Sequence, residues 1–218
     1  MKKIKNGFII FWLVAIIDLI IIATHNISFH FYIKPLLMPT LIATFLFANG
    51  WQKNLAKLII MGLFFSFAGD VFLLWDKYFI PGLLCFLTTH ILYIVYFVKT
   101  ANKSGWYIKK HPFAIFFPLI YVASLVWLLF PFLDALKIPV IIYALVIGTM
   151  FLSTINLYKK VKSPTYIYFI SGAIFFVLSD SLLAINKFYT PFSYAGVTIM
   201  LTYCTAQYLI VKGAIQQL

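Results

Sequence analysis

Long apolar runs, separated by short polar segments rich in lysine, follow one another along the 218-residue chain. A helix that crosses a bilayer needs about 20 predominantly apolar residues. On that criterion the sequence predicts eight membrane-spanning helices, at about 8–24, 35–49, 56–75, 80–98, 112–131, 138–157, 165–184 and 193–212. We therefore expect an all-α fold, a polytopic helical bundle that forms a single integral membrane domain over residues 1–218.

The first apolar run resembles a secretory signal peptide only over its first few residues. It follows Lys2, Lys3 and Lys5, but it is too long for a signal peptide, it contains Asp18, and no A-x-A cleavage site comes after it. We interpret it as a first transmembrane helix that is retained.

The composition supports a lipid environment. Hydrophobic residues make up 64% of the chain and charged residues only 10%, whereas soluble domains average about 25% charged residues. The net charge of +12 could indicate nucleic-acid binding, but the lysines form short clusters between apolar runs and no continuous basic face. Cys85 and Cys204 both lie inside apolar runs, so they predict neither a disulfide framework nor a metal pair. We expect no nucleic-acid partner.

The lysines divide unequally between the two sets of loops that eight helices would create. Thirteen lie on the side of the N-terminus and four on the other side. The first set is Lys2, Lys3, Lys5, Lys53, Lys57, Lys99, Lys103, Lys109, Lys110, Lys159, Lys160, Lys162 and Lys212, and the second set is Lys34, Lys77, Lys137 and Lys187. Lysine and arginine are enriched in cytoplasmic loops. We expect a protein of a bacterial inner membrane with both termini in the cytoplasm.

A weak internal repeat relates the two halves of the chain. GDVFLLWDKY at 69–78 aligns without gaps with SDSLLAINKF at 179–188, which pairs Asp70 with Asp180 and Lys77 with Lys187. Lys34 and Lys137 each precede a helix in the same relative place. The alignment indicates two four-helix halves of the same orientation, although chance similarity of apolar helices is the alternative. Repeats of this kind place binding sites at their interface.

Three of the five acidic residues, Asp18, Asp70 and Asp180, lie inside predicted helices. Asp70 and Asp180 are each about five residues from the outer end of their helix, which is about 7 Å of helix length. Ionisable residues inside membranes are costly and usually mark functional sites. They are therefore candidates for catalysis, with interhelical pairing to Lys34 or Lys187 as the structural alternative. For Asp18 a structural role is favoured.

Other polar side chains are aligned on the apolar helices and could line a shared cavity. His90 and Tyr93 share one helix face, and Tyr203 and Gln207 share another. Together with Lys34 and Lys187 they are the predicted substrate-binding residues, although a role in packing and interhelical hydrogen bonding is the simpler reading of several. His25, His30 and His111 are expected to be solvated. Asp70, Asp180 and His90 could supply three zinc ligands, but we predict neither a metal nor a cofactor.

Several short motifs, taken in their order, resemble the YhhN-like family of membrane lysoplasmalogenases. They are KPLLMP at 34–39, FAGD at 67–70, GLLCFLTTHILY at 82–93, SDSLLAINKF at 179–188 and AQYLI at 206–210. The resemblance covers most of the chain. It implies hydrolysis of the alkenyl ether bond of a lysoplasmalogen, a lysophospholipid embedded in the bilayer, to a fatty aldehyde and a glycerophospho-ethanolamine or -choline.

Two carboxyl groups suit that reaction. A protonated one would donate to carbon and an ionised one would stabilise the cation and take a proton from water. We expect Asp70 and Asp180 to converge and share one proton, with Lys34 or Lys187 on the phosphate or on the ionised partner. The alternatives are a proton-coupled transporter or lipid-binding protein without catalysis, and a metal-dependent membrane amidase or esterase. The sequence indicates no oligomeric state.

Overall fold

The computed structural model describes residues 2–48, 50–101 and 107–218. Within these ranges the chain is helical and contains no β-strand, as the apolar runs predict. The α-helices of the described residues are α1 (Lys2–Ala23), α2 (Ile27–Ile33), α3 (Leu37–Phe47), α4 (Lys57–Phe72), α5 (Phe79–Ala101), α6 (Tyr107–Lys110), α7 (Phe116–Leu129), α8 (Lys137–Ile155), α9 (Ser163–Ala184) and α10 (Ala195–Ile215).

Short 3₁₀ turns and one π-helical turn join or extend these helices. The 3₁₀ turns are η1 (Lys34–Leu36), η2 (Gly50–Gln52), η3 (Asp76–Tyr78), η4 (Pro112–Ile115), η5 (Phe130–Phe132) and η6 (Asp134–Leu136), and the π-turn is η7 (Ile185–Tyr189). Three of the 3₁₀ turns, η1, η4 and η5, carry proline in their first two positions, where the missing N–H costs little. Through η1, helix α2 continues into α3 as one bent helical segment.

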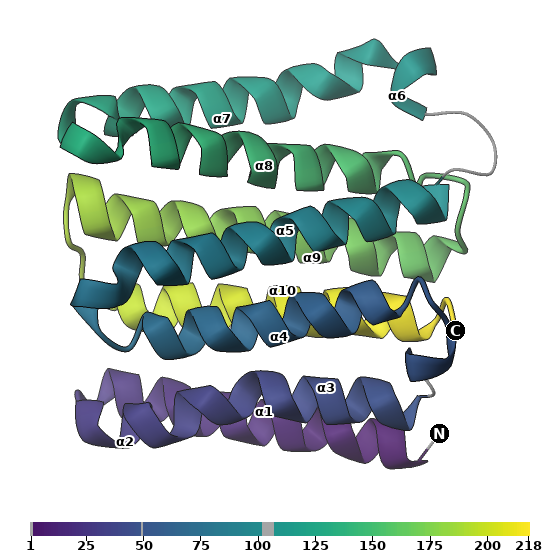
Figure 1. Cartoon of the computed structure of the whole chain (residues 1–218), viewed down its shortest axis with the longest axis horizontal. Coiled ribbons are helices and arrows are strands. Elements are labelled where there is room, and N and C mark those ends of the chain that lie inside the picture. Colours follow the sequence, from purple (N-terminus) through teal and green to yellow (C-terminus); the bar gives the residue numbers. More distant parts are fainter. Residues whose placement is uncertain (1, 49, 102–106) are drawn as a thin grey trace.

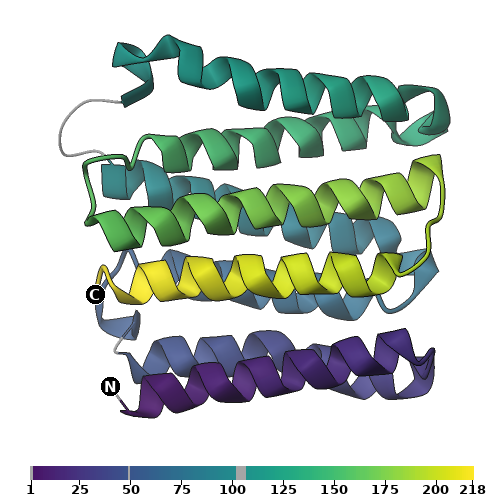
Figure 2. The same ribbon diagram turned by 180° about the vertical axis from the view of Figure 1, so that it is seen from behind.

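Each of the eight predicted apolar runs coincides with one long helical segment, and these segments run antiparallel to their chain neighbours (Figures 1 and 2). In the part of the chain that the structure describes, six segments are long and apolar enough to span a bilayer. Helices α4 and α10 lie alongside them (Figure 1). The all-α membrane bundle is therefore confirmed, whereas eight spans remain a prediction.

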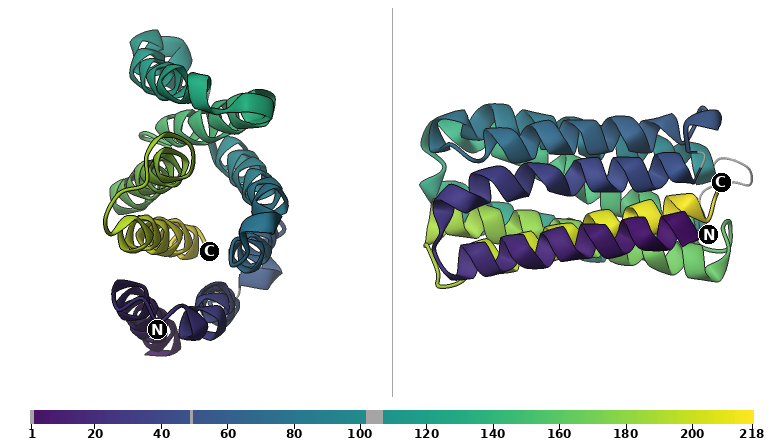
Figure 3. Two further views of the ribbon diagram at one scale, coloured as in Figure 1. Left: turned by 90° about the vertical axis from the view of Figure 1, so that its left-hand side faces the viewer. Right: turned by 90° about the horizontal axis from the view of Figure 1, so that it is seen from below.

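Two helix pairs form the centre of the bundle. Helix α4 packs along α5, and α9 packs along α10. Viewed from the end, these pairs face each other, α1 and α3 close one side, and α8 and α7 extend the other (Figure 3). Gly172 lets α9 approach α10 closely, since a Cβ there would lie 2.8 Å from Ile210 Cγ1 and 3.2 Å from the Ala206 carbonyl oxygen. The central packing positions the polar side chains described below.

The corresponding helix contacts recur in the two halves of the chain. Helix α3 contacts α4 as α8 contacts α9, and α1 contacts α3 as α7 contacts α8. These contacts are compatible with the four-plus-four repeat, which remains a prediction.

Both ends of the chain lie at one end of the bundle, at the right of Figure 1. The lysine-rich predicted set lies at this end, apart from Lys103, which falls outside the described residues. The opposite end contains η1, η3, η7 and the start of α10. Two predicted boundaries at that end are wrong. The second helical segment begins at Ile27 and not near residue 35, so Lys34 lies inside it and not at its start, and α4 ends at Phe72 and not near residue 75. Asp70 therefore lies in the last turn of α4.

Candidate active site

A cavity of about 810 Å³ opens at the end of the bundle opposite the chain termini. Its size falls within the range of about 300–1,000 Å³ that is usual for small-molecule sites. Its polar lining is contributed by His25, His30, Lys34, Asp70, Asp76, Ser179, Asp180, Asn186, Lys187, Ser193, Tyr194 and Tyr203. Apolar side chains, among them Phe79, Phe86 and Met200, complete the wall. An elongated amphipathic molecule would find both kinds of surface here.

Asp70 reaches this cavity from the last turn of α4. The residue is 2% exposed, and its Oδ2 accepts a hydrogen bond of 2.8 Å from the Tyr203 hydroxyl group on α10. The Tyr203 ring is held edge-on by Phe86 and Phe176. The orientation of one Asp70 oxygen is therefore fixed by a neighbouring helix.

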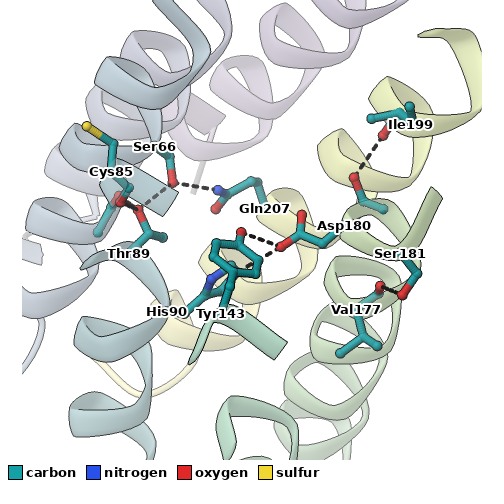
Figure 4. A network of polar contacts seen from close by, with 12 residues as sticks. Ser66, Cys85, Thr89, His90, Tyr143, Val177, Asp180, Ser181, Ile199 and Gln207 are labelled. Carbon is teal, nitrogen blue, oxygen red and sulfur yellow. Dashed lines mark hydrogen bonds and ion pairs between the residues drawn. The ribbon is translucent and has the colours of Figure 1, made fainter. Parts of the chain in front are cut away.

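Asp180 enters the same cavity from α9 (Figure 4). Its Oδ2 accepts a hydrogen bond of 2.5 Å from the Tyr143 hydroxyl group on α8, and His90 Nε2 lies 3.6 Å from that oxygen. The Asp180 side chain is 13% exposed. Neither nitrogen of the buried His90 ring has a hydrogen-bond partner among the described residues. The His90 ring therefore lies next to the Asp180 carboxyl group without a hydrogen bond to it, and it is not part of the cavity lining.

The two aspartates have closely matched surroundings. Each uses Oδ2 to accept from a buried tyrosine, and no hydrogen bond of the described residues engages either Oδ1 atom or joins the two carboxyl groups. Their lining of one cavity is what the sequence analysis expected. The sharing of one proton between them remains a prediction.

The two lysines predicted for the site have different surroundings. Lys187 forms an ion pair with Asp76 at 2.8 Å and is 37% exposed, so the alternative in which it pairs with Asp70 or Asp180 is not realised. Lys187 does line the cavity, and its role in substrate binding remains a prediction. Lys34 lines the cavity and is only 7% exposed. Within residues 2–48, 50–101 and 107–218, no hydrogen bond or ion pair involves its ammonium group.

His30 is a further correction, because it is not solvated as expected. Its side chain is 19% exposed, and its Nδ1 lies 2.7 Å from Oδ1 of the buried Asp18. His30 also lines the cavity, as does the exposed His25. This contact gives Asp18 an interhelical partner, which is compatible with the structural role predicted for it.

Tyr93 and Gln207 are fully buried and do not line the cavity. The Tyr93 hydroxyl group donates to Gln207 Oε1 at 2.8 Å. Gln207 Nε2 donates to Ser66 Oγ at 2.9 Å, and Ser66 contacts the Thr89 hydroxyl group at 3.1 Å (Figure 4). This network joins α4, α5 and α10 next to the two carboxyl groups.

The sequence analysis did not single out Tyr143, although a usable signal was present. Tyr143 lies about five residues inside the predicted helix 138–157, which at about 1.5 Å per residue is the depth expected for Asp180. Which side of α8 faces Asp180 depends on the rotation of that helix, and hydropathy does not report it. The contact between His30 and Asp18 was also missed, because the two residues lie on different helices.

The arrangement provides the buried Asp70 carboxyl group, the largely buried Asp180 carboxyl group, a buried cation and an apolar wall in one cavity. Among the described residues, no three histidine, cysteine or acidic side chains come close enough together to hold a metal ion. The two carboxyl groups are suited to acid–base chemistry, and Lys34 in the same cavity could bind an anion.

Comparisons with known proteins give the chain its relatives. It is 35% identical over 185 residues to lysoplasmalogenase TMEM86A of Homo sapiens, which covers 79% of this chain and 72% of the human protein. Lysoplasmalogenase TMEM86B of Homo sapiens is 29% identical over 80% of this chain and 71% of its own length. No solved structure matches the chain significantly. Residues 29–214 match the model of the YhhN family, and the chain belongs to that family.

Proposed function

We propose that this protein is a membrane lysoplasmalogenase, which hydrolyses the alkenyl ether bond of lysoplasmalogens. Its relatives of the YhhN family that are named lysoplasmalogenases support this activity. The observation that carries the proposal for this chain is that Asp70 and Asp180, from α4 and α9, line one cavity with apolar walls. The substrate would be a lysophospholipid taken from the bilayer.

The first chemical step is transfer of a proton to carbon. One carboxylic acid, Asp70 or Asp180, donates its proton to the second carbon of the alkenyl chain. The carbon–carbon double bond is lost, and the carbon attached to the ether oxygen becomes an oxocarbenium ion. The second carboxylate stabilises this positive charge electrostatically. This stabilisation is strong because water is largely excluded from the site.

The second step is capture of water. The ionised carboxylate takes a proton from a water molecule as the water oxygen bonds to the cationic carbon, which gives a hemiacetal. The carboxylic acid formed in this step then protonates the glycerol oxygen, whose bond to the hemiacetal carbon breaks. The other carboxylate takes the proton of the hemiacetal hydroxyl group, which forms the aldehyde and restores one protonated and one ionised carboxyl group. The products are a fatty aldehyde and a glycerophospho-ethanolamine or -choline, and one water molecule is consumed.

The hydrogen bonds from Tyr203 to Asp70 and from Tyr143 to Asp180 fit this scheme, because each leaves Oδ1 for substrate or water. His90 would support Asp180, and Tyr93 and Gln207 would hold the helices that carry the site. We also propose that the lysine-rich end of the bundle faces the cytoplasm. The cavity would then open among the headgroups of the outer leaflet, beside the scissile bond of an embedded lysolipid.

Aspartate-to-asparagine substitution tests the proposal, because it keeps the shape and removes the ionisable group. Asp70→Asn and Asp180→Asn should each lower kcat for aldehyde release by about 10²–10⁴-fold. Asp134→Asn is the matched control, since Asp134 is exposed at the same end of the bundle in η6. If both variants kept most of the wild-type turnover, the carboxyl mechanism would be wrong.

The assay also separates the alternative functions when the purified protein is used in detergent. A transporter has no gradient to work with there and should release no aldehyde, whereas a hydrolase should release it. A metal-dependent amidase or esterase would lose its activity on treatment with a chelator. Aldehyde release that survives the chelator supports the lysoplasmalogenase proposal.

A further inference from the structure

Two side chains that can carry positive charge lie four residues apart at one corner of the cavity. His30 is on α2 and Lys34 begins η1, and the two residues share one face of this continuous helical segment. Both line the cavity that contains Asp70 and Asp180. The proposed acid–base chemistry uses neither of them.

Lys34 is a buried cation, and within the described part of the chain its ammonium group has no hydrogen-bond or ion-pair partner. It interacts electrostatically with Asp70, but no ion pair forms between them, and no hydrogen bond of the described residues involves its ammonium group. A buried charge is costly unless it is paired. Since the side chain lines the cavity, a ligand there is the natural source of the missing partner.

His30 is held in one orientation by Asp18. The contact of 2.7 Å between His30 Nδ1 and Asp18 Oδ1 engages one ring nitrogen, and no hydrogen bond of the described residues engages Nε2. With Nδ1–H donated to the carboxylate, a protonated ring presents Nε2–H as a second donor. Asp18 therefore restricts the orientation of the His30 ring.

We infer that Lys34 and His30, the latter oriented by Asp18, form the subsite that binds the phosphate group of the lysolipid. This inference rests on the proposed function, and it names the part of the substrate that the carboxyl pair leaves unassigned. Phosphate oxygens accept strong hydrogen bonds from ammonium and imidazolium groups. The phosphate and the alkenyl ether are attached to the same glycerol, so both must fit one cavity.

The proposed subsite predicts a preference for lipids that carry a phosphate group. A lysolipid with a phosphate should bind more tightly than the corresponding alkenylglycerol, which has the same chain and glycerol but no phosphate. Because hydrogen bonds to charged groups are stronger than those between neutral groups, we expect discrimination of about 10-fold or more in Kd, where 10-fold corresponds to about 1.4 kcal/mol.

The test measures binding with ligands that the enzyme cannot cleave. The full chain, purified in detergent, is titrated with a 1-O-alkyl-glycerophosphoethanolamine and with the matching 1-O-alkylglycerol, and the ratio of the two Kd values is the readout. Lys34→Met and His30→Phe should each reduce this ratio by about 10-fold and leave the Kd of the neutral lipid unchanged. Lys77→Met removes an equal charge from η3, outside the cavity lining, and should keep the wild-type ratio.

Two further variants guard against a purely structural effect. Lys34→Arg keeps a cation and should retain the discrimination. If Lys34→Met fails to fold, loss of the discrimination in Lys34→Arg would contradict the assignment. Asp18→Asn should weaken discrimination in the wild-type background but add nothing in the His30→Phe background, because the pair acts as a unit. Additive losses, or equal losses for both lipids, would overturn the assignment.

The remaining outcomes separate this inference from the proposed function. Wild-type discrimination in the Lys34→Met and His30→Phe variants overturns the subsite, whether or not the protein releases aldehyde. Discrimination that depends on both residues without any turnover of a lysoplasmalogen supports the subsite and contradicts the hydrolase. If inorganic phosphate displaces the ether lysolipid at a concentration near the Kd of that lipid, the site binds free phosphate and the headgroup assignment fails.

Discussion

At the scale of single residues, two tyrosines determine how the carboxyl groups face the cavity. Tyr203 donates to Asp70 and Tyr143 donates to Asp180. Each tyrosine belongs to a different helix from its aspartate, so the hydrogen bond both orients the carboxyl group and couples two helices. The proposed reaction needs this orientation because a misplaced acid cannot reach the alkenyl carbon.

Tyr143→Phe and Tyr203→Phe should each lower kcat by about 10–100-fold, the effect of losing a hydrogen bond to a charged group. The KM for the lysolipid should change little, since neither hydroxyl group is assigned to the headgroup. Tyr96→Phe is the control, because Tyr96 is buried on α5 but does not line the cavity. A comparable fall in kcat for Tyr96→Phe would mean that any change to a buried tyrosine disturbs the bundle.

The sequence could predict Asp70 and Asp180 because a carboxyl group in an apolar helix is costly and therefore informative. It could not predict their tyrosine partners or the His30–Asp18 pair. Those contacts depend on the rotation of each helix about its axis and on which helices are neighbours, and tyrosine is compatible with both a lipid-facing and a buried position. For the same reason the sequence could not predict that Lys187 pairs with Asp76, which lies in η3.

At the scale of elements, the α9–α10 contact positions the site, because these helices carry Asp180 and Tyr203. Gly172→Ala should lower the free energy of unfolding by about 1–3 kcal/mol, as overpacking does. The new Cβ would meet the backbone of α10 at 3.2 Å as well as Ile210 Cγ1 at 2.8 Å, and a backbone cannot move aside alone. Unfolding of the purified protein in detergent measures the change.

Gly148→Ala is the matched substitution on α8. Its Cβ would meet Val122 Cγ2 at 2.9 Å and no backbone atom within 4 Å. Helix propensity favours both substitutions by about 1 kcal/mol, so the difference between the two variants isolates the packing term. Equal stability of the two proteins would show that α9 and α10 can separate without cost.

Helix positions were predictable at this scale, whereas helix ends were less so. The apolar runs locate all eight long segments because lipid requires continuous hydrogen-bonded helices. The end of α4 at Phe72 was not evident, since Leu73, Leu74 and Trp75 continue the apolar run through a turn. Hydropathy reports the depth of a residue and does not report where the backbone leaves the helix.

At the scale of the whole molecule, the orientation of the bundle determines which leaflet supplies the substrate. Thirteen of the 17 lysines belong to the predicted set on the side of the chain termini, and the cavity opens at the other end. Positive charge near spanning helices is retained in the cytoplasm. These two observations are the basis for the proposal that the active site faces the outer leaflet.

Single cysteines introduced at opposite ends of the bundle measure this orientation. In a background with Cys85 and Cys204 replaced by alanine, Thr190→Cys lies on the exposed turn beyond η7 and Lys162→Cys lies in the exposed segment before α9. A membrane-impermeant maleimide added to intact cells should label Thr190→Cys at once, and should label Lys162→Cys only after the cells are permeabilised. Aldehyde release by both variants controls for folding. The reverse labelling pattern would show that the cavity faces the cytoplasm. The lysolipid would then have to come from the inner leaflet, and the proposed carboxyl chemistry would be unaffected.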